Sequence, residues 1–363
     1  MSAAGYFSQS YTEARAKFLA AAERAGLDVE SHPHPLLGRD GEALAMDVVR
    51  DGPKDAPSVL LVSSACHGVE GYCGSGVQVA LLGDEAWRGA SRKADVAVLY
   101  VHGLNPYGFS WWRRTTHENV DLNRNFRDFH VEPSRNADYD ELAASLVPTI
   151  WPPNTAVLER IESFVAARGE RALQQAISGG QYHHPQGLFY GGAGPTWSHQ
   201  TLRQVLREHG TRCSGLAWID LHTGLGPSGH GERIYAGRDD AASVERARAW
   251  WGDITSIYDG SSTSAVLTGM MWLCAYEECP QAEYTGIALE YGTLPQPEVM
   301  AALRADQWLE NHPEAGDEQR RTIKQQVRDA FYTDTDVWKE QIVTQAVDAA
   351  YGAIRGLSAG SAR

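Results

Sequence analysis

Four short apolar runs most strongly constrain what this chain can fold into. They cover residues 58–63, 95–101, 216–221 and 285–289, and they are rich in valine, leucine, isoleucine and alanine. A short apolar run of this kind favours a strand that is covered on both faces, as strands of a parallel sheet are. The runs therefore predict an α/β fold with a mixed, mostly parallel sheet and helices on both faces.

Helical patterns lie between and beyond these runs. Ser10 followed by Glu13 is a capping-box signature, which predicts a helix that ends near Gly26. Apolar residues recur at helical spacing over 155–175, and again from Trp338 to Ala349 near the C-terminus. No linker, repeat or low-complexity tract divides the chain, so we expect one domain over residues 1–363.

Charge and composition narrow the possible partners and location. The chain has 46 acidic and 32 basic residues, a net charge of −14, which disfavours nucleic acid and anionic membranes as partners. No apolar run reaches about 18 residues, so no transmembrane helix is expected. The N-terminus has neither the basic nor the apolar region of a signal peptide. Five cysteines are few for 363 residues, which favours reduced thiols and a cytoplasmic location.

Three potential metal ligands follow two of the predicted strands. His67 and Glu70 come shortly after the run 58–63, and His222 directly follows the run 216–221. In open α/β sheets, sites form at the carboxyl ends of the strands, where these side chains could meet. A catalytic zinc needs three protein ligands and one open position. Taken alone, His67 and Glu70 fit a polar surface turn better, and His222 fits a buried structural histidine better, but together they predict a zinc site.

A base and two cations complete the expected chemistry. Glu290 directly follows the run 285–289, so that strand would deliver a carboxylate to the same edge of the sheet. A partly buried carboxylate beside a metal can take a proton from the attacking water. Arg113 and Arg124 supply planar guanidinium groups that suit a carboxylate or a developing oxyanion.

These motifs resemble the zinc carboxypeptidases of the carboxypeptidase A-like superfamily. The chain is more closely similar to a bacterial branch of unknown function within that superfamily. The resemblance runs from about His67 to Gly292. It implies a carboxypeptidase-like fold, with His67, Glu70 and His222 holding zinc and Glu290 acting as general base and acid.

The same resemblance assigns the residues that would bind substrate. Arg113 lies in a Trp-Arg-Arg-Thr run that begins at Trp112, and the matching family arginine polarises the scissile carbonyl. Asn123 and Arg124 match the Asn-Arg pair that holds the terminal carboxylate of the substrate.

The chain also departs from the family pattern. The digestive enzymes carry an arginine where this chain has Val69. The mobile tyrosine of the family has no motif that fixes it, and four tyrosines lie in the interval: Tyr235, Tyr258, Tyr276 and Tyr284. The Asp-Leu-His-Thr-Gly run around His222 and the Leu-Glu-Tyr-Gly run around Glu290 also resemble the aspartoacylase and succinylglutamate desuccinylase relatives.

Two other motifs are set aside. Residues 224–229 fit G-x-G-x-x-G, but Pro227 and the glycines after it do not open the helix that a nucleotide site requires. The segment 74–76 lacks the G-x-S-x-G spacing of a serine nucleophile.

The sequence therefore predicts a zinc-dependent amide hydrolase that acts next to a free carboxylate. A metallocarboxypeptidase acting on peptides is the leading expectation. An aspartoacylase-type enzyme acting on N-acyl amino acids is the first alternative, and a non-catalytic metal-binding module is the second.

Overall fold

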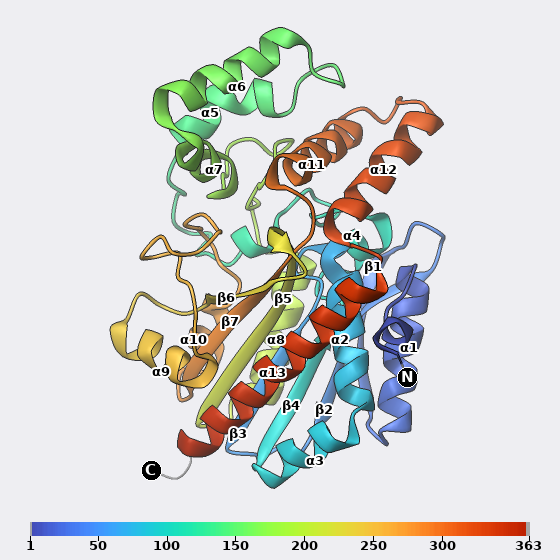
Figure 1. Ribbon diagram of the computed structural model, residues 1–363, viewed down its shortest axis with the longest axis vertical. Helices are drawn as coiled ribbons and strands as arrows, with labels where there is room; N and C mark the ends of the chain where they lie inside the picture. Colours follow the sequence, from blue (N-terminus) through green and yellow to red (C-terminus); the bar gives the residue numbers. More distant parts are fainter. Residues whose placement is uncertain (1, 361–363) are drawn as a thin grey trace.

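A seven-stranded mixed sheet forms the centre of the computed structural model, which describes residues 2–360 (Figure 1). Its strand order is β1-β2-β4-β3-β5-β7-β6. The neighbours β4, β3, β5 and β7 run parallel, whereas β1, β2 and β6 pair antiparallel. The strands are β1 Val29–Leu37, β2 Ala43–Asp51, β3 Ser58–Ser63, β4 Val96–His102, β5 Gly215–Ser228, β6 Gly231–Tyr235 and β7 Glu283–Gly292. The predicted α/β class with a mixed sheet is confirmed.

The four central strands are the four predicted apolar runs. Every side chain of β3 and β4 is buried, which explains why their sequences are continuously apolar. The strands β5 and β7 extend beyond the predicted runs at both ends. Their register places His222 opposite Glu290, so two of the predicted site residues are cross-strand neighbours.

The edge strands were not predicted. β1 pairs only with β2, and its sequence mixes polar residues with Pro33 and Pro35. Proline lacks the N–H that a central strand must donate, and it is tolerated at an edge. A strand of this composition carries neither an apolar run nor a clear alternation.

Helices cover both faces of the sheet. α1, α2 and α13 pack with the core on one face, and α8 and α10 pack with the core on the other. The predicted first helix is α1, whose first turn is capped by Ser10 Oγ accepting from Glu13 N at 3.1 Å. The helices are α1 Tyr11–Arg24, α2 Gly71–Gly83, α3 Glu85–Lys93, α4 Pro106–Trp111, α5 Ala137–Leu146, α6 Thr155–Arg168, α7 Glu170–Ser178, α8 Trp197–Gly210, α9 Ala241–Trp251, α10 Leu273–Glu278, α11 Gln296–Asn311, α12 Asp317–Phe331 and α13 Asp336–Gly360, with short 3₁₀ turns at Ala3–Tyr6, Gly68–Glu70 and Leu122–Arg124.

A helical layer lies beyond one end of the sheet. Figure 1 shows α5, α6, α7, α11 and α12 together there, and they share an apolar core. The helical pattern over 155–175 is divided between α6 and α7, because Gly169 adopts a φ of 86° between them. No helix in the described residues is both long and apolar enough to cross a membrane. All five cysteines are buried and unpaired.

Candidate metal centre

A tight turn after β3 positions the first two predicted ligands. Its backbone N–H groups at Gly68 and Val69 donate to the carbonyls of Arg114 and Arg113, at 3.1 and 2.8 Å. Residue 68 must be glycine, since a Cβ there would lie 2.1 Å from the backbone carbon of Gly108. The turn is therefore held firmly against the segment that carries the two arginines.

The structure brings His67, Glu70 and His222 together, with all three side chains buried. Nδ1 of His67 lies 2.8 Å from Oε1 of Glu70, and Nδ1 of His222 lies 3.1 Å from Oε2. The two Nδ1 atoms are 3.2 Å apart. Thr223 N also donates to Glu70, at 3.1 Å, which fixes the carboxylate between the two rings.

This donor set fits a zinc ion. Zinc bonds to nitrogen and oxygen are about 2.0–2.1 Å long, so tetrahedral donors lie roughly 3.3 Å apart. The observed separations of 2.8–3.2 Å are close to that value. Two imidazole nitrogens that face one another can share only one proton, whereas a cation between them would satisfy both lone pairs.

The neighbouring charges shift the pKa values of Glu70 and His222 in opposite directions. Burial alone would raise the pKa of Glu70, but His67 and His222 together hold it far below its usual range. Burial alone would lower the pKa of His222, but the carboxylates of Asp220 and Glu70 raise it well above the usual value. Two carboxylates therefore face the His222 ring, with Glu70 at Nδ1 and Asp220 at Nε2.

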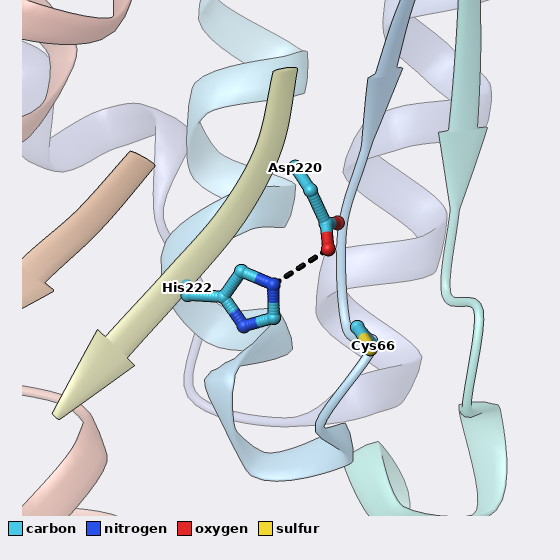
Figure 2. A group of neighbouring side chains, drawn as sticks. All are labelled: Cys66, Asp220 and His222. Atoms are coloured by element: carbon cyan, nitrogen blue, oxygen red, sulfur yellow. Dashed lines mark hydrogen bonds and ion pairs between the residues drawn. The ribbon is translucent and has the colours of Figure 1, made fainter. Parts of the chain in front are cut away.

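A carboxylate orients the third ligand from behind. Nε2 of His222 lies 2.5 Å from Oδ2 of Asp220 (Figure 2). The other oxygen of Asp220 accepts from Ser63 Oγ at 2.5 Å. A hydrogen bond of this kind leaves Nδ1 as the free ring nitrogen and makes it a better ligand. Figure 2 also shows Cys66 nearby, on the loop after β3. Burial and the carboxylate of Asp220 raise the pKa of Cys66 far above its usual value, so its protonated thiol is a poor ligand.

Sequence reasoning missed Asp121 and Arg114. Asp121 Oδ1 lies 3.3 Å from Nε2 of His67, and Nη2 of Arg114 lies 2.8 Å from the same nitrogen, so a carboxylate and a guanidinium both contact the first histidine. Nε of Arg114 donates to Asp121 at 2.9 Å, and its Nη1 donates to Glu70 at 3.3 Å. The position of Asp121, two residues before the predicted Asn123, was the only available indication.

The structure places Arg113 outside the group of residues that lines the central cavity. Its guanidinium turns away to α11, where Nη1 lies 3.3 Å from Glu310 and Nε lies 3.6 Å from Asp306. Arg114 takes the expected place and lines the central cavity. Adjacent side chains project in different directions, so the Arg-Arg doublet did not show which guanidinium enters the site.

Glu290 faces the same cavity from β7. Its side chain is 8% exposed, and its Oε1 accepts from Leu225 N at 3.0 Å. Burial and the negative charge of Glu70 raise the pKa of Glu290 to about 8. A carboxyl group with this pKa can both accept and release a proton near neutral pH.

Arg124 and Asn123 also line the cavity. The Arg124 guanidinium donates to the carbonyl of Ser178 through Nε at 3.1 Å and Nη2 at 2.6 Å, and Nη1 donates to the carbonyl of Asn123 at 2.8 Å. Asn123 Oδ1 accepts from Met271 N at 2.8 Å. Both side chains are therefore held in place before any substrate arrives.

The rest of the cavity is largely apolar and is covered by the helical layer. One wall combines β6 with the loop before α10, and the other is formed by α11 and α12. The apolar lining residues are Phe189, Leu225, Ile234, Ala236, Ile257, Ala265, Leu267, Met270, Trp272, Ala288, Val299, Met300, Leu303 and Phe331. Gln174 and Ser178 of α7 also line it.

Of the four tyrosines left open by the sequence, only Tyr235 lines this cavity. Its hydroxyl donates to the carbonyl of Arg238 at 2.9 Å, and that of Tyr258 donates to Gly237 at 2.9 Å. The Tyr276 hydroxyl accepts from Arg238 N at 3.2 Å. None of these three hydroxyl groups is directed at the predicted ligands.

Comparison with solved structures gives similar chains at low identity. Bovine thrombin-activatable fibrinolysis inhibitor, in complex with a tick carboxypeptidase inhibitor, is 12% identical with a TM-score of 0.45, covering 93% of this chain and 97% of that one. A metallo-carboxypeptidase from Burkholderia cenocepacia is 12% identical with a TM-score of 0.41, covering 99% and 71%. A protein described as of the succinylglutamate desuccinylase/aspartoacylase family, from Shewanella amazonensis SB2B, is 16% identical with a TM-score of 0.35, covering 79% and 72%.

A comparison with curated proteins gave no match. One family model matches residues 7–345, which is most of the chain. The family is described as "Protein of unknown function (DUF2817)". The chain belongs to this family.

Proposed function

We propose that this protein is a zinc-dependent hydrolase that cleaves an amide bond next to a free carboxylate. The observation that carries the proposal is the convergence of His67 Nδ1, His222 Nδ1 and the Glu70 carboxylate within 2.8–3.2 Å, beside the buried Glu290. His67, Glu70 and His222 would hold zinc. Zinc would supply a Lewis acid and make water a better nucleophile near neutral pH.

Glu290 moves the protons in this proposal. Its carboxylate accepts a proton from the attacking water and then donates it to the leaving nitrogen. The hydrogen bond from Leu225 N holds one carboxylate oxygen and leaves the other free for this transfer. A pKa of about 8 supports both steps, because neither protonation state is strongly disfavoured near neutral pH.

The two cavity arginines act on the substrate. Arg114 lies beside Glu70 and His67, so its guanidinium is close to where negative charge develops on the carbonyl oxygen. Arg124 and Asn123 bind the free carboxylate, which orients the scissile bond toward the ligands. In a carboxypeptidase, the carboxylate that binds to Arg124 and Asn123 would be the C-terminus of a peptide.

The covered cavity also favours the alternative substrate class. Side chains of α7 and α11 line it, so the space beyond the scissile bond is limited. A short peptide or an N-acyl amino acid fits such a space better than a folded polypeptide. The apolar walls favour an apolar group on the substrate.

A substrate panel tests the proposal on the zinc-loaded protein. It would compare short and long peptides with free or amidated C-termini, together with N-acyl amino acids. Cleavage that requires a free carboxylate supports the anchor at Arg124. Faster cleavage of longer peptides identifies a carboxypeptidase, and cleavage confined to acyl amino acids identifies the deacylase. Full zinc occupancy without turnover of any compound would contradict the proposal and favour a non-catalytic metal-binding module.

A further inference from the structure

Two apolar groups of side chains that belong to separate cores border the central cavity. The first group lies near β6, on β7 and in the segment before α10, and it includes Ile234, Ala236, Ile257, Met270, Trp272 and Ala288. The second group lies mainly on α11 and α12, and it includes Phe189, Val299, Met300, Leu303 and Phe331. His67, His222 and Glu290 line the same cavity, so a substrate held there can contact both groups.

The first group adjoins the residues proposed to bind the free carboxylate. Met271 N donates to Asn123 Oδ1 at 2.8 Å. A Cβ at Gly269 would lie 2.2 Å from the carbonyl oxygen of Arg124, so the segment before α10 packs directly against this arginine. The first group therefore borders the part of the substrate that carries the carboxylate.

The second group is packed against β5 directly after His222. Thr223 Oγ1 donates to the carbonyl of Phe331 at 2.7 Å, and a Cβ at Gly224 would lie 2.8 Å from the Phe331 ring. The next residue, Leu225, lines the cavity and donates its N–H to Glu290 at 3.0 Å. Since the first group borders the carboxylate, the second is left for the other side of the scissile bond, where the acyl group lies.

α11 presents an uncharged face to this part of the cavity. The residues of α11 that line it recur every three or four positions and so share one side of the helix: Gln296, Val299, Met300 and Leu303. Charged residues of α11 are engaged elsewhere. Arg304 donates to two carbonyls at the end of α5, and Asp306 contacts Lys324 of α12.

The charged groups of the cavity are already committed. Apart from the histidines, the charged side chains that line it in the described part of the chain are Arg114, Arg124, Asp220 and Glu290. Asp220 and Arg114 are bound to neighbouring residues of the site, and Glu290 and Arg124 act in the proposed reaction. A second charged group on the substrate would therefore be buried without a free opposite charge, which is unfavourable.

We propose that Leu225, Val299, Met300, Leu303 and Phe331 form an acyl pocket, which binds the apolar, uncharged acyl group of an N-acyl amino acid. This inference rests on the function proposed above and names its substrate class. Hydrolysis adds water across the amide C–N bond: the hydroxyl goes to the carbonyl carbon and a proton to the nitrogen. The products are an apolar carboxylic acid and a free amino acid.

A series of N-acyl leucines tests the acyl pocket on the zinc-loaded protein. The value of kcat/KM should rise by about fourfold for each methylene between acetyl and hexanoyl, because each added group is buried. N-isohexanoyl-leucine and N-succinyl-leucine are similar in shape, but the succinyl group carries a carboxylate. Its kcat/KM should be at least about 100-fold lower. Equal kcat/KM for these two compounds would overturn the inference.

Met300→Lys should shift the preference toward the succinyl compound. Met300 is only partly buried, so a flexible lysine can take its place and present an ammonium group to the pocket. The kcat/KM ratio of succinyl to isohexanoyl compound should rise by at least about tenfold. Ala301→Lys is the matched control: it adds the same charge at an exposed neighbour that does not line the cavity, and it should leave the ratio unchanged.

Ligand binding to zinc-loaded Glu290→Gln separates the acyl pocket from the reaction. Isothermal titration calorimetry should show that N-isohexanoyl-leucine binds at least about tenfold more tightly than N-succinyl-leucine. If the proposed function is wrong, the wild type will cleave no compound, and this binding preference still tests the pocket. Equal affinity for the two compounds would overturn the inference whether or not any compound is cleaved.

Discussion

At the scale of single residues, the neighbouring arginines 113 and 114 have opposite environments. Arg114 contacts Asp121, Glu70 and His67 and lines the cavity. Arg113 lies among the acidic residues of α11, which Lys324 of α12 also contacts at 2.7 Å. One guanidinium therefore lies at the cavity among the predicted ligands, and the other joins the turn to the helical layer.

Substitution of the two arginines should separate these roles. Arg114→Met should lower kcat by about 10²–10³-fold, because it removes a preorganised donor to the developing oxyanion. Arg113→Met should leave kcat nearly unchanged and reduce the free energy of unfolding by roughly 1.5–3 kcal/mol. Steady-state kinetics at measured zinc content and urea unfolding check both. Loss of kcat in Arg113→Met alone, with zinc retained, would restore the original assignment.

Glu290 provides a second residue-scale prediction. Glu290→Gln keeps the size and shape of the side chain but removes its proton-transfer capacity, so kcat should fall by about 10²–10⁴-fold. Zinc content should stay unchanged, because Glu290 is not among the predicted ligands. Steady-state kinetics checks the fall in kcat, and elemental analysis checks the zinc content. A fully active Glu290→Gln protein would show that another group moves the proton.

The raised pKa of Glu290 also predicts a pH dependence of stability. In the metal-free protein its pKa is about 8, against 4.5 for an ordinary glutamate, because of burial and Glu70. The stability that the protonated Glu290 carboxyl contributes is fully present below pH 4.5 and is lost as the pH rises through 8. Between pH 4.5 and pH 8, each rise of one pH unit should reduce the free energy of unfolding by up to about 1.4 kcal/mol. Urea unfolding of wild type and Glu290→Gln in chelator measures the difference, which should shrink to nothing if the carboxyl ionises normally.

At the scale of elements, β5 and the turn after β3 carry the site. Asp220 and His222 are two residues apart on β5, so they share a side of the strand and form their hydrogen bond within one element. The turn after β3 depends on close backbone contact at Gly68. Each element therefore fixes a ligand by local geometry.

Asp220→Asn tests the support that β5 gives to His222. The asparagine amide cannot accept the hydrogen bond from His222 Nε2 in the same way as the Asp220 carboxylate. The His222 ring therefore loses the partner that orients it. We expect zinc affinity to fall by about 10–100-fold. Competition with a chromophoric chelator measures this. Unchanged affinity would show that the Asp220–His222 contact does not tune the ligand.

Gly68→Ala tests the packing of the turn. The added Cβ would lie 2.1 Å from the backbone of Gly108, so the turn or its neighbour must shift. Overpacking of this kind reduces the free energy of unfolding by about 1–3 kcal/mol. Gly83→Ala on α2 is the matched control, because its Cβ would meet nothing within 4 Å. Equal stability of the two variants in urea would contradict the proposed contact.

Much of the fold, but less of the candidate site, could be predicted from local sequence patterns. β3 is evident from sequence because both its faces are buried, whereas β1 is an edge strand and its prolines hide it. The meeting of His67, Glu70 and His222 could be predicted because each follows a recognisable strand. The choice of Arg114 over Arg113 and the role of Asp121 could not, because they depend on side-chain directions that long-range packing sets.

At the scale of the whole molecule, the helical layer lies beyond the edge of the sheet (Figure 1), and residues from both line the central cavity. The strands and the turn after β3 carry the predicted ligands and Glu290, while side chains of α7, α11 and α12 line the rest of the cavity. This division cannot be foreseen from local patterns, since it depends on how distant helices pack. For the same reason, the sequence predicts the reaction better than it predicts the substrate.

Anomalous diffraction at the zinc edge, from crystals of the zinc-loaded protein, tests the central claim most directly. The account predicts a peak about 2.0–2.1 Å from Nδ1 of both His67 and His222 and bonded to the carboxylate of Glu70, with Glu290 facing it. Full zinc loading with no peak among these three side chains would contradict the account.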